Sequence, residues 1–208
     1  TIPSISLGLL LSGYIIDKKE STVTPEEIMQ LNIADINKMD RGVTKNWNPK
    51  IALSSDIFMY TAMASPLLFL AGENTRKDFL KTSVISAEVF FLNTGLTYLT
   101  KSLVDRKRPY LYNPDVPMSK KLKSTSKNSF FSGHTSTTAS MSYSFAFMYA
   151  NYYPNSKAKP AVWTLAAGLP ALTGFFRVKS GKHFWTDILV GYAVGAFTGW
   201  LVPYLHEI

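Results

Sequence analysis

The sequence predicts an all-α fold, a bundle of about six core helices that cross a membrane. Two observations carry this prediction. Five apolar windows contain 98 of the 208 residues but only two of the 36 charged side chains, Asp56 and Glu88. Each window is also close to the ~20 residues that a helix needs to cross a hydrocarbon core. The windows are 51–72, 82–100, 135–156, 160–176 and 188–205.

An alternative is a soluble all-helical protein whose central helices are buried on every side. Helices on a soluble surface carry a charged stripe, so 98 such residues would hold on the order of twenty charges. The window 135–156 keeps the alternative open, because its many Ser and Thr residues suit close packing in a membrane or in a soluble core. The uncharged run 1–16 is either a trimmed first span or a remnant of processing.

Composition limits the other possibilities. The length fits a single domain covering residues 1–208, and the absence of cysteine excludes disulfides, iron–sulfur clusters, thiolate zinc sites and cysteine nucleophiles. The polar segment 17–50 contains one expected short helix, capped by Thr24 ahead of Pro25 and Glu26. Neither the oligomeric state nor the identity of a bound lipid follows from composition.

Most of the net charge of +8 lies in one connection. Between Lys101 and Lys127 there are eight basic residues and two acidic ones. Because successive spans alternate direction, the connection 101–132 shares a face with 177–183, and the short basic loops 73–81 and 151–159 share the other. The positive-inside tendency places the short loops in the cytoplasm. The long basic connection breaks that rule, which indicates an anionic ligand.

Three polar clusters lie at helix ends on this shared face. They are Lys101-x6-Arg108-Pro109, Phe131-Ser132-Gly133-His134 and Arg177-x5-His183-x3-Asp187. Taken singly, each has an ordinary structural explanation: a solvated loop, a helix cap, and a polar pair at a helix start. A Ser-Gly pair before a helix can also bind phosphate through backbone amides. Together the three clusters indicate one anion site.

The residue types in these clusters suit phosphoryl transfer. His183 and Asp187 are four residues apart, so on a helix the carboxylate can accept a hydrogen bond from one imidazole nitrogen and leave the other free. Arginine, lysine and backbone amides stabilise the charge on a phosphoryl group in transfer. One histidine attacks phosphorus and another protonates the leaving oxygen. No cluster of carboxylates suited to a divalent metal is present, so no metal or other cofactor is expected.

The three clusters resemble the signature of the type-2 phosphatidic acid phosphatase superfamily. Its pattern is Lys, six residues, Arg-Pro; then Pro-Ser-Gly-His; then Ser-Arg, five residues, His, three residues, Asp. The order and spacings match over residues 101–187, and the preceding spans resemble the six-helix membrane members. Phe131 replaces the family's Pro, and Phe176 replaces the Ser before Arg177, which removes one possible hydrogen bond to phosphate.

The resemblance assigns roles to individual residues. It implies that His183 is the nucleophile that forms a phosphohistidine, that Asp187 orients it, and that His134 is first the acid and then the base that activates water. It further implies a set of phosphate-binding residues: Lys101, Arg108, Ser132, Gly133 and Arg177.

The expected protein is an integral-membrane lipid phosphatase of the inner membrane, with its active site facing the periplasm or exterior. Phosphatidic acid, phosphatidylglycerol phosphate, an isoprenyl diphosphate and lipid A are the expected substrate classes. A soluble periplasmic acid phosphatase or a vanadium-dependent haloperoxidase is the alternative enzyme. A non-catalytic binder of anionic lipid head groups is a third hypothesis. Nucleic-acid binding is disfavoured, because no binding motif is present.

Overall fold

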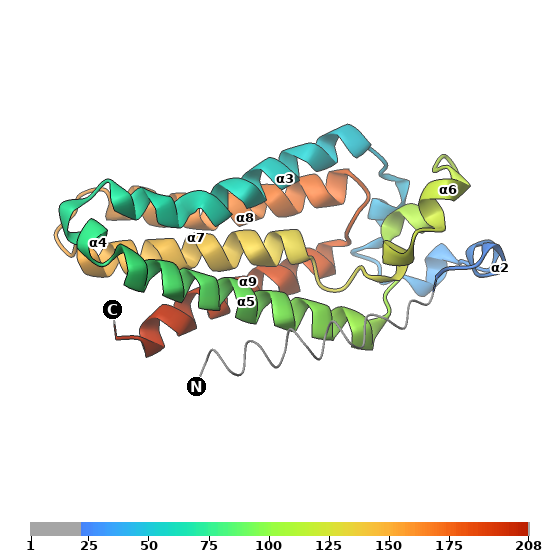
Figure 1. Ribbon diagram of the computed structural model, residues 1–208. Coiled ribbons are helices and arrows are strands. Elements are labelled where there is room, and N and C mark those ends of the chain that lie inside the picture. The colour runs from blue at the N-terminus through green and yellow to red at the C-terminus, as the bar shows by residue number, and fades with distance from the viewer. Residues whose placement is uncertain (1–21, 208) are drawn as a thin grey trace.

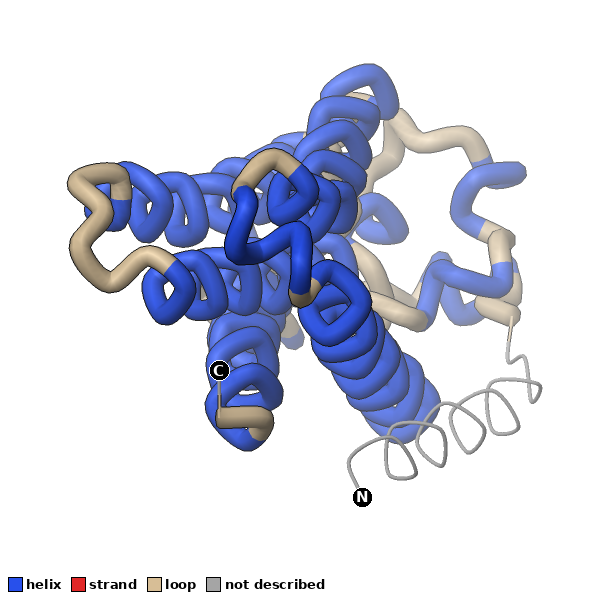
Figure 2. The backbone as a smooth tube through the Cα atoms, turned by 60° about the vertical axis from the view of Figure 1, so that its left-hand side comes forward, coloured by secondary structure: helices blue, strands red, loops and turns tan. Residues whose placement is uncertain are grey.

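The computed structural model describes residues 22–207, and every regular element in that range is helical (Figures 1 and 2). Five long helices form the bundle, and each overlaps one of the apolar windows. The uncharged run 1–16 lies outside the described residues. The long helices are α3 (Pro49–Ala64), α5 (Phe79–Val104), α7 (Gly133–Tyr152), α8 (Lys159–Lys179) and α9 (Trp185–Leu205).

Short elements connect the long helices. The α-helical ones are α2 (Pro25–Met29), α4 (Glu73–Lys77) and α6 (Met118–Lys121), and the 3₁₀ ones are η1 (Ile33–Asp35), η2 (Arg41–Lys45), η3 (Ser65–Leu70), η4 (Pro109–Tyr112) and η5 (Ser124–Lys127). The predicted cap of α2 is confirmed, because the Glu27 amide donates to the Thr24 hydroxyl. The window 51–72 divides into α3 and η3 because Pro66 has no N–H to continue an α-helix.

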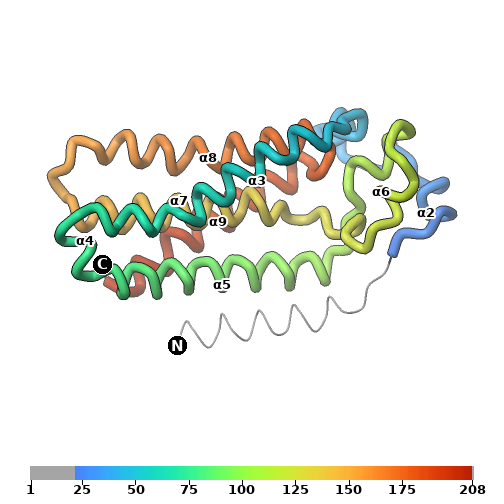
Figure 3. The backbone as a smooth tube through the Cα atoms, turned by 45° about the horizontal axis from the view of Figure 1, so that its top comes forward, coloured from blue at the N-terminus to red at the C-terminus, as the bar shows by residue number. Residues whose placement is uncertain are grey.

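Helix α7 lies in the middle of the bundle, between α3 and α8 on one side and α5 and α9 on the other (Figures 1 and 3). Its hydroxyl-bearing residues face inward and bond to neighbouring helices. Ser142 Oγ donates to the Ala166 carbonyl on α8 at 2.9 Å, and Asn93 Nδ2 on α5 donates to Thr137 Oγ1 at 3.3 Å. The polar window 135–156 is therefore the core of the bundle.

A row of glycines on α9 permits its close approach to α7. A Cβ added at Gly195 would lie 2.2 Å from the Ser136 carbonyl oxygen, and one added at Gly199 would lie 2.3 Å from that of Ser140. Gly191 meets the backbone one turn nearer the start of α7 in the same way. Only glycine allows two helix backbones to approach this closely, as in small-xxx-small packing in membranes.

The outer surface of the bundle is apolar. Leu53, Leu80, Leu165 and Leu189 each expose more than half of their area. Three helical segments of the described chain are long and apolar enough to cross a membrane: Pro49–Leu70, Lys159–Lys179 and Trp185–Leu205. Polar side chains inside and apolar ones outside reverse the pattern of a soluble bundle. The chain is therefore a helical membrane protein.

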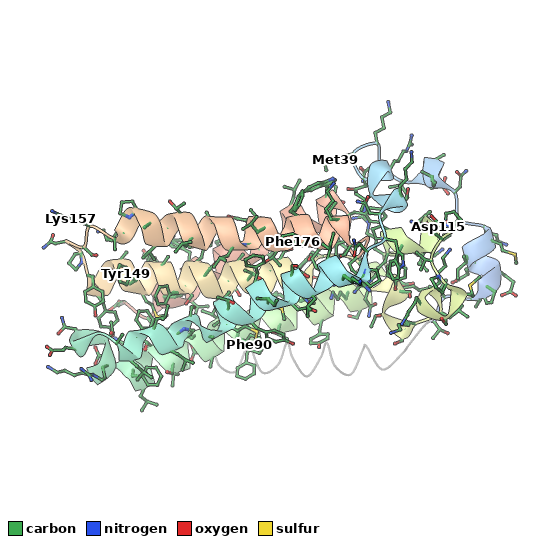
Figure 4. All side chains as sticks on the ribbon, turned by 90° about the horizontal axis from the view of Figure 1, so that it is seen from above. Met39, Phe90, Asp115, Tyr149, Lys157 and Phe176 are labelled. Atoms are coloured by element: carbon green, nitrogen blue, oxygen red, sulfur yellow. The ribbon has the colours of Figure 1, made fainter. Side chains whose placement is uncertain are left out.

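The two ends of the bundle differ. One end, called here the motif end, is covered by the segments 22–48 and 105–132 together with the turn 180–184 between α8 and α9. The other, the opposite end, carries α4 and the connection between α7 and α8 (Figure 1). Figure 4 shows Met39 and Asp115 at the motif end, and Tyr149 and Lys157 at the opposite end. The alternation of helices predicted this arrangement.

Candidate active site

The three sequence clusters converge at the motif end. The Ser132 amide donates to the Asp187 carbonyl at 3.0 Å, which joins the second cluster to the third. A Cβ added at Gly133 would lie 3.5 Å from Lys101 Nζ, which places the first cluster beside the second. Clusters separated by up to 86 positions in the chain therefore form one site.

His183 is buried, with 1% of its surface exposed, in the turn before α9. Its Nδ1 lies 2.8 Å from the Ser129 carbonyl oxygen. Because a carbonyl can only accept, Nδ1 must carry the proton, and Nε2 then keeps its lone pair. This is the tautomer that a histidine nucleophile requires.

Asp187 lies behind His183 without bonding directly to it. Its Oδ2 is 3.5 Å from His183 Nδ1, and it accepts from Ser129 Oγ at 2.6 Å and from the Phe184 amide at 2.8 Å. The expected hydrogen bond from imidazole to carboxylate is therefore corrected: Nδ1 donates to the Ser129 carbonyl instead, and Asp187 lies beside it at ion-pair distance. Asp187 holds the hydroxyl of Ser129, and the carbonyl of the same residue holds the imidazole.

A second buried carboxylate, Asp40, supports Asp187 from the segment 22–48. Arg106 joins the two, with Nη2 at 2.9 Å from Asp40 Oδ2 and Nη1 bonded to Asp187 Oδ1. The Arg106 guanidinium also lies 4.5 Å from the centre of the Phe184 ring. Burial opposes ionisation of Asp40, but hydrogen bonds from Thr186, Asn37 and Arg106 together outweigh it and lower the pKa of Asp40. Neither Asp40 nor Arg106 is among the site residues that the sequence predicts.

His134, the first-turn histidine of α7, pairs with a carboxylate from α3. Its Nε2 lies 2.9 Å from Asp56 Oδ1, and the same oxygen lies 3.6 Å from Arg177 Nη1. Asp56 was also absent from the predicted site residues. The signal for it was present, because an ionisable residue within an apolar span commonly has a functional role.

Arg177, near the end of α8, is buried and incompletely bonded. Its Nη1 lies 3.4 Å from Ser55 Oγ, but its Nε has no hydrogen-bond partner among residues 22–207. A buried guanidinium N–H without an acceptor is costly, and the oxygen of a bound anion would satisfy it. The neighbouring Phe176 stacks on Phe58 of α3 at 5.7 Å, so the family's serine position is part of a helix contact here.

Arg108 joins the long connection to the turn before α9. It donates to the carbonyls of Thr125 at 2.9 Å, Asn128 at 3.2 Å and Lys182 at 3.4 Å. These bonds use three of the five N–H donors of a guanidinium. Arg108 therefore has a structural role, and its two remaining donors are left for a ligand.

Ser132 and Gly133 form the start of α7 as expected. Ser132 is the N-cap, and its hydroxyl accepts from the Thr135 amide at 3.4 Å. Phe131, which occupies the family's proline position, is buried with 3% of its surface exposed. The first amides of α7 point out of the helix toward the other two clusters, where a helix N-terminus favours negative charge.

The site is strongly positive. Burial lowers the pKa of His183 well below its usual value, and the charges of Arg108, Arg177 and Lys101 lower it further. Burial also lowers the pKa of Lys182 to about 8, with contributions from Arg108 and Arg177. His183 is therefore neutral at neutral pH, and the cations around it favour an anionic ligand.

An apolar cavity of about 250 Å³ adjoins the cationic cluster. It lies between α3, α5 and α7. Lys101 and Gly133 line one part of it, and Met63 and Phe90 line another. The cavity therefore joins the cationic site to the apolar outer part of the bundle.

Comparison with known families agrees with this geometry. The family model of the PAP2 superfamily matches residues 82–207, which include all three clusters. The chain belongs to the PAP2 superfamily. This confirms the resemblance stated from the motifs.

A curated protein and a solved structure are similar to this PAP2 chain. Phosphatidylglycerophosphatase B of Bacillus subtilis (strain 168) is 32% identical over 120 residues, which are 57% of this chain and 55% of that protein. The aligned part thus spans about half the length of the relative. The crystal structure of a transmembrane PAP2-type phosphatidylglycerolphosphate phosphatase from Bacillus subtilis matches with a TM-score of 0.59, over 97% of this chain and 96% of that one. At 24% identity, that match shows a shared fold.

Proposed function

We propose that this PAP2 protein is an integral-membrane phosphatase that removes a phosphoryl group from a phosphorylated membrane lipid. The observation that carries the proposal is the buried cationic cluster around His183, in which Arg177 Nε has no partner among the described residues. A phosphomonoester or diphosphate would supply the missing acceptor and match the charge.

The geometry supports a two-step reaction. His183 Nε2 attacks phosphorus as the bond to the lipid oxygen breaks, and His134 gives a proton to that oxygen. His134 then takes a proton from water, whose oxygen attacks the phosphohistidine, and the N–P bond breaks to release phosphate. Arg177, Lys101 and the start of α7 stabilise charge on the phosphoryl oxygens. No step calls for a metal.

A lipid substrate fits the surroundings of the site. The helices around it expose apolar side chains, and the cavity lined by Lys101, Gly133 and Phe90 joins cationic to apolar surface. A lipid in the bilayer could therefore place its phosphate at the cations and its chain against the helices. Phosphatidylglycerol phosphate is the first substrate to test, because both relatives carry that activity in their names.

The proposed location is the inner membrane, with the motif end facing outward. The opposite end carries Arg76 and Lys77 in α4 and Lys157 in the connection between α7 and α8, and the positive-inside tendency assigns such short connections to the cytoplasm. The cations of the motif end are explained by phosphate binding instead.

The test is phosphate release by the purified protein in detergent from a panel of phosphatidylglycerol phosphate, phosphatidic acid, an isoprenyl diphosphate and lipid A. We expect release from at least one lipid without added metal, and inhibition by orthovanadate, which imitates five-coordinate phosphorus. Binding of these lipids without release of phosphate would contradict the proposal and would leave a lipid-binding protein.

A further inference from the structure

Asp56 is one of two charged residues in the five apolar windows, and each of the two pairs with a histidine. Asp56 meets His134 at the motif end, and Glu88 meets His206 at the opposite end with a distance of 2.6 Å. A carboxylate in an apolar helix is costly and is maintained where it has a partner. The two pairs therefore invite comparison, because only the first lies in the proposed site.

The position of Asp56 determines which nitrogen of His134 faces the substrate. Asp56 Oδ1 lies 2.9 Å from Nε2, and an ionised carboxylate only accepts, so Nε2 carries a proton. Nδ1 makes no hydrogen bond within residues 22–207, and it is the nitrogen left for the oxygen of a substrate. Both side chains are about one-third exposed, so the pair borders the open part of the site.

The surroundings of His134 disfavour the doubly protonated ring. Burial is the largest cause, and the charges of Arg177 on α8, Lys101 on α5, Arg108 and Lys182 act in the same direction. A general acid must nevertheless hold two protons before it gives one away. Among the described residues, Asp56 is the anion that bonds to this ring.

We propose that Asp56 is a positioning residue for His134, whose carboxylate holds the imidazolium form in place so that Nδ1 can protonate the leaving oxygen of the lipid. The inference rests on the proposed function. In the first step the P–O bond breaks, the new N–P bond forms at His183, and the Nδ1 proton moves to the lipid alcohol. In the second step Nδ1 regains a proton from the attacking water, so the charge on the pair is restored.

The test compares Asp56→Asn with Glu88→Gln on the lipid that the wild-type protein hydrolyses best. Asparagine preserves the shape and an acceptor oxygen but removes the charge. We expect kcat to fall by about 10- to 100-fold in Asp56→Asn, KM to stay the same or fall because an anion beside Arg177 is lost, and Glu88→Gln to behave as wild type. Because the neutral variant holds the imidazolium less well, the basic limb of the kcat profile should move to lower pH by about one unit or more.

Two further measurements separate this role from a structural one. Orthovanadate should inhibit Asp56→Asn at least as well as wild type, which shows a folded site, and Asp56→Glu should recover part of the lost kcat because it restores the charge. A wild-type kcat and pH profile in Asp56→Asn would overturn the inference while leaving the proposed function intact. A rise in kcat would also overturn it, since Asp56 would then only compete with phosphate for Arg177. No phosphate release by the wild-type protein from any lipid would refute the proposed function, and this inference with it.

Discussion

The motif end and the opposite end of the bundle contain similar parts in different surroundings. Each has a histidine paired with a carboxylate from an apolar helix: His134 with Asp56, and His206 with Glu88. At the motif end four cations act on the histidine, and a second, buried histidine lies nearby. At the opposite end the basic residues Arg76 and Lys77 of α4 are exposed.

The difference shows that buried charge around a histidine–carboxylate pair is what marks a candidate site. An exposed charge is screened by water and salt, whereas buried charges are screened much less and act on one another more strongly. The motif end buries its cations because the segments 22–48 and 105–132 cover them, and α4 with short loops provides no comparable cover at the opposite end (Figure 1). Equivalent substitutions at the two ends should therefore have unequal effects on activity and stability.

The largest expected difference in phosphate release is between variants of His183, at the motif end, and His206, at the opposite end. His183→Ala removes the proposed nucleophile and should lower phosphate release by about 10⁴-fold or more. His206→Ala, at the opposite end, should leave release unchanged. Steady-state assays on both variants, checked for folding by circular dichroism, would measure this. Full activity in His183→Ala would contradict the proposed role of His183 as the nucleophile.

The next effect is on stability. Arg106→Met leaves Asp187 and Asp40 as buried carboxylates without their cation, which should lower the free energy of unfolding by about 3–5 kcal/mol. Lys77→Met, on an exposed residue of the opposite end, should change it little. Reversible unfolding of both variants in mixed detergent micelles gives the values. Equal stabilities would mean that the network is not held together by Arg106.

The same substitution, arginine to lysine, can be compared at a buried guanidinium group, Arg177, and at an exposed one, Arg76. Arg177→Lys keeps the charge but removes the planar fork and the unpaired Nε donor, and kcat/KM should fall by about 100-fold. Arg76→Lys at the opposite end is the matched control and should retain wild-type kcat/KM. A tolerated lysine at position 177 would show that charge alone, without the fork, is sufficient.

The smallest effect is a dependence on pH. Burial, with Arg108 and Arg177, lowers the pKa of Lys182 to about 8, and its Nζ lies over the rings of Trp47 and Tyr110. As pH rises through this value Lys182 loses its charge, so kcat/KM for an anionic lipid should fall a few-fold. Lys182→Arg stays protonated, so its profile should lack this additional fall. Superimposable profiles of the two proteins would exclude a contribution from Lys182.

The sequence predicted the helical bundle because the signal is local. Near-absence of charge over 98 residues and window lengths near a membrane span are properties of single segments. Within the described residues, three helical segments are long and apolar enough to be spans, and neither α5 nor α7 is among them. Helix α7 is rich in Ser and Thr, and the structure explains this composition, because α7 is surrounded by the other helices and bonds to them through its hydroxyls.

The sequence alone therefore determined the family, the fold class and the motif residues, His134, His183 and Asp187 among them. Their spacing within each cluster can be read along the chain. Only the tertiary structure decided what surrounds them. Asp40 bonds to Thr186 across 146 positions, and Asp56 meets His134 across 78. Ser129 bonds to both Asp187 and His183. Such partners depend on how helices cross and loops fold back, and no local pattern in the chain records that.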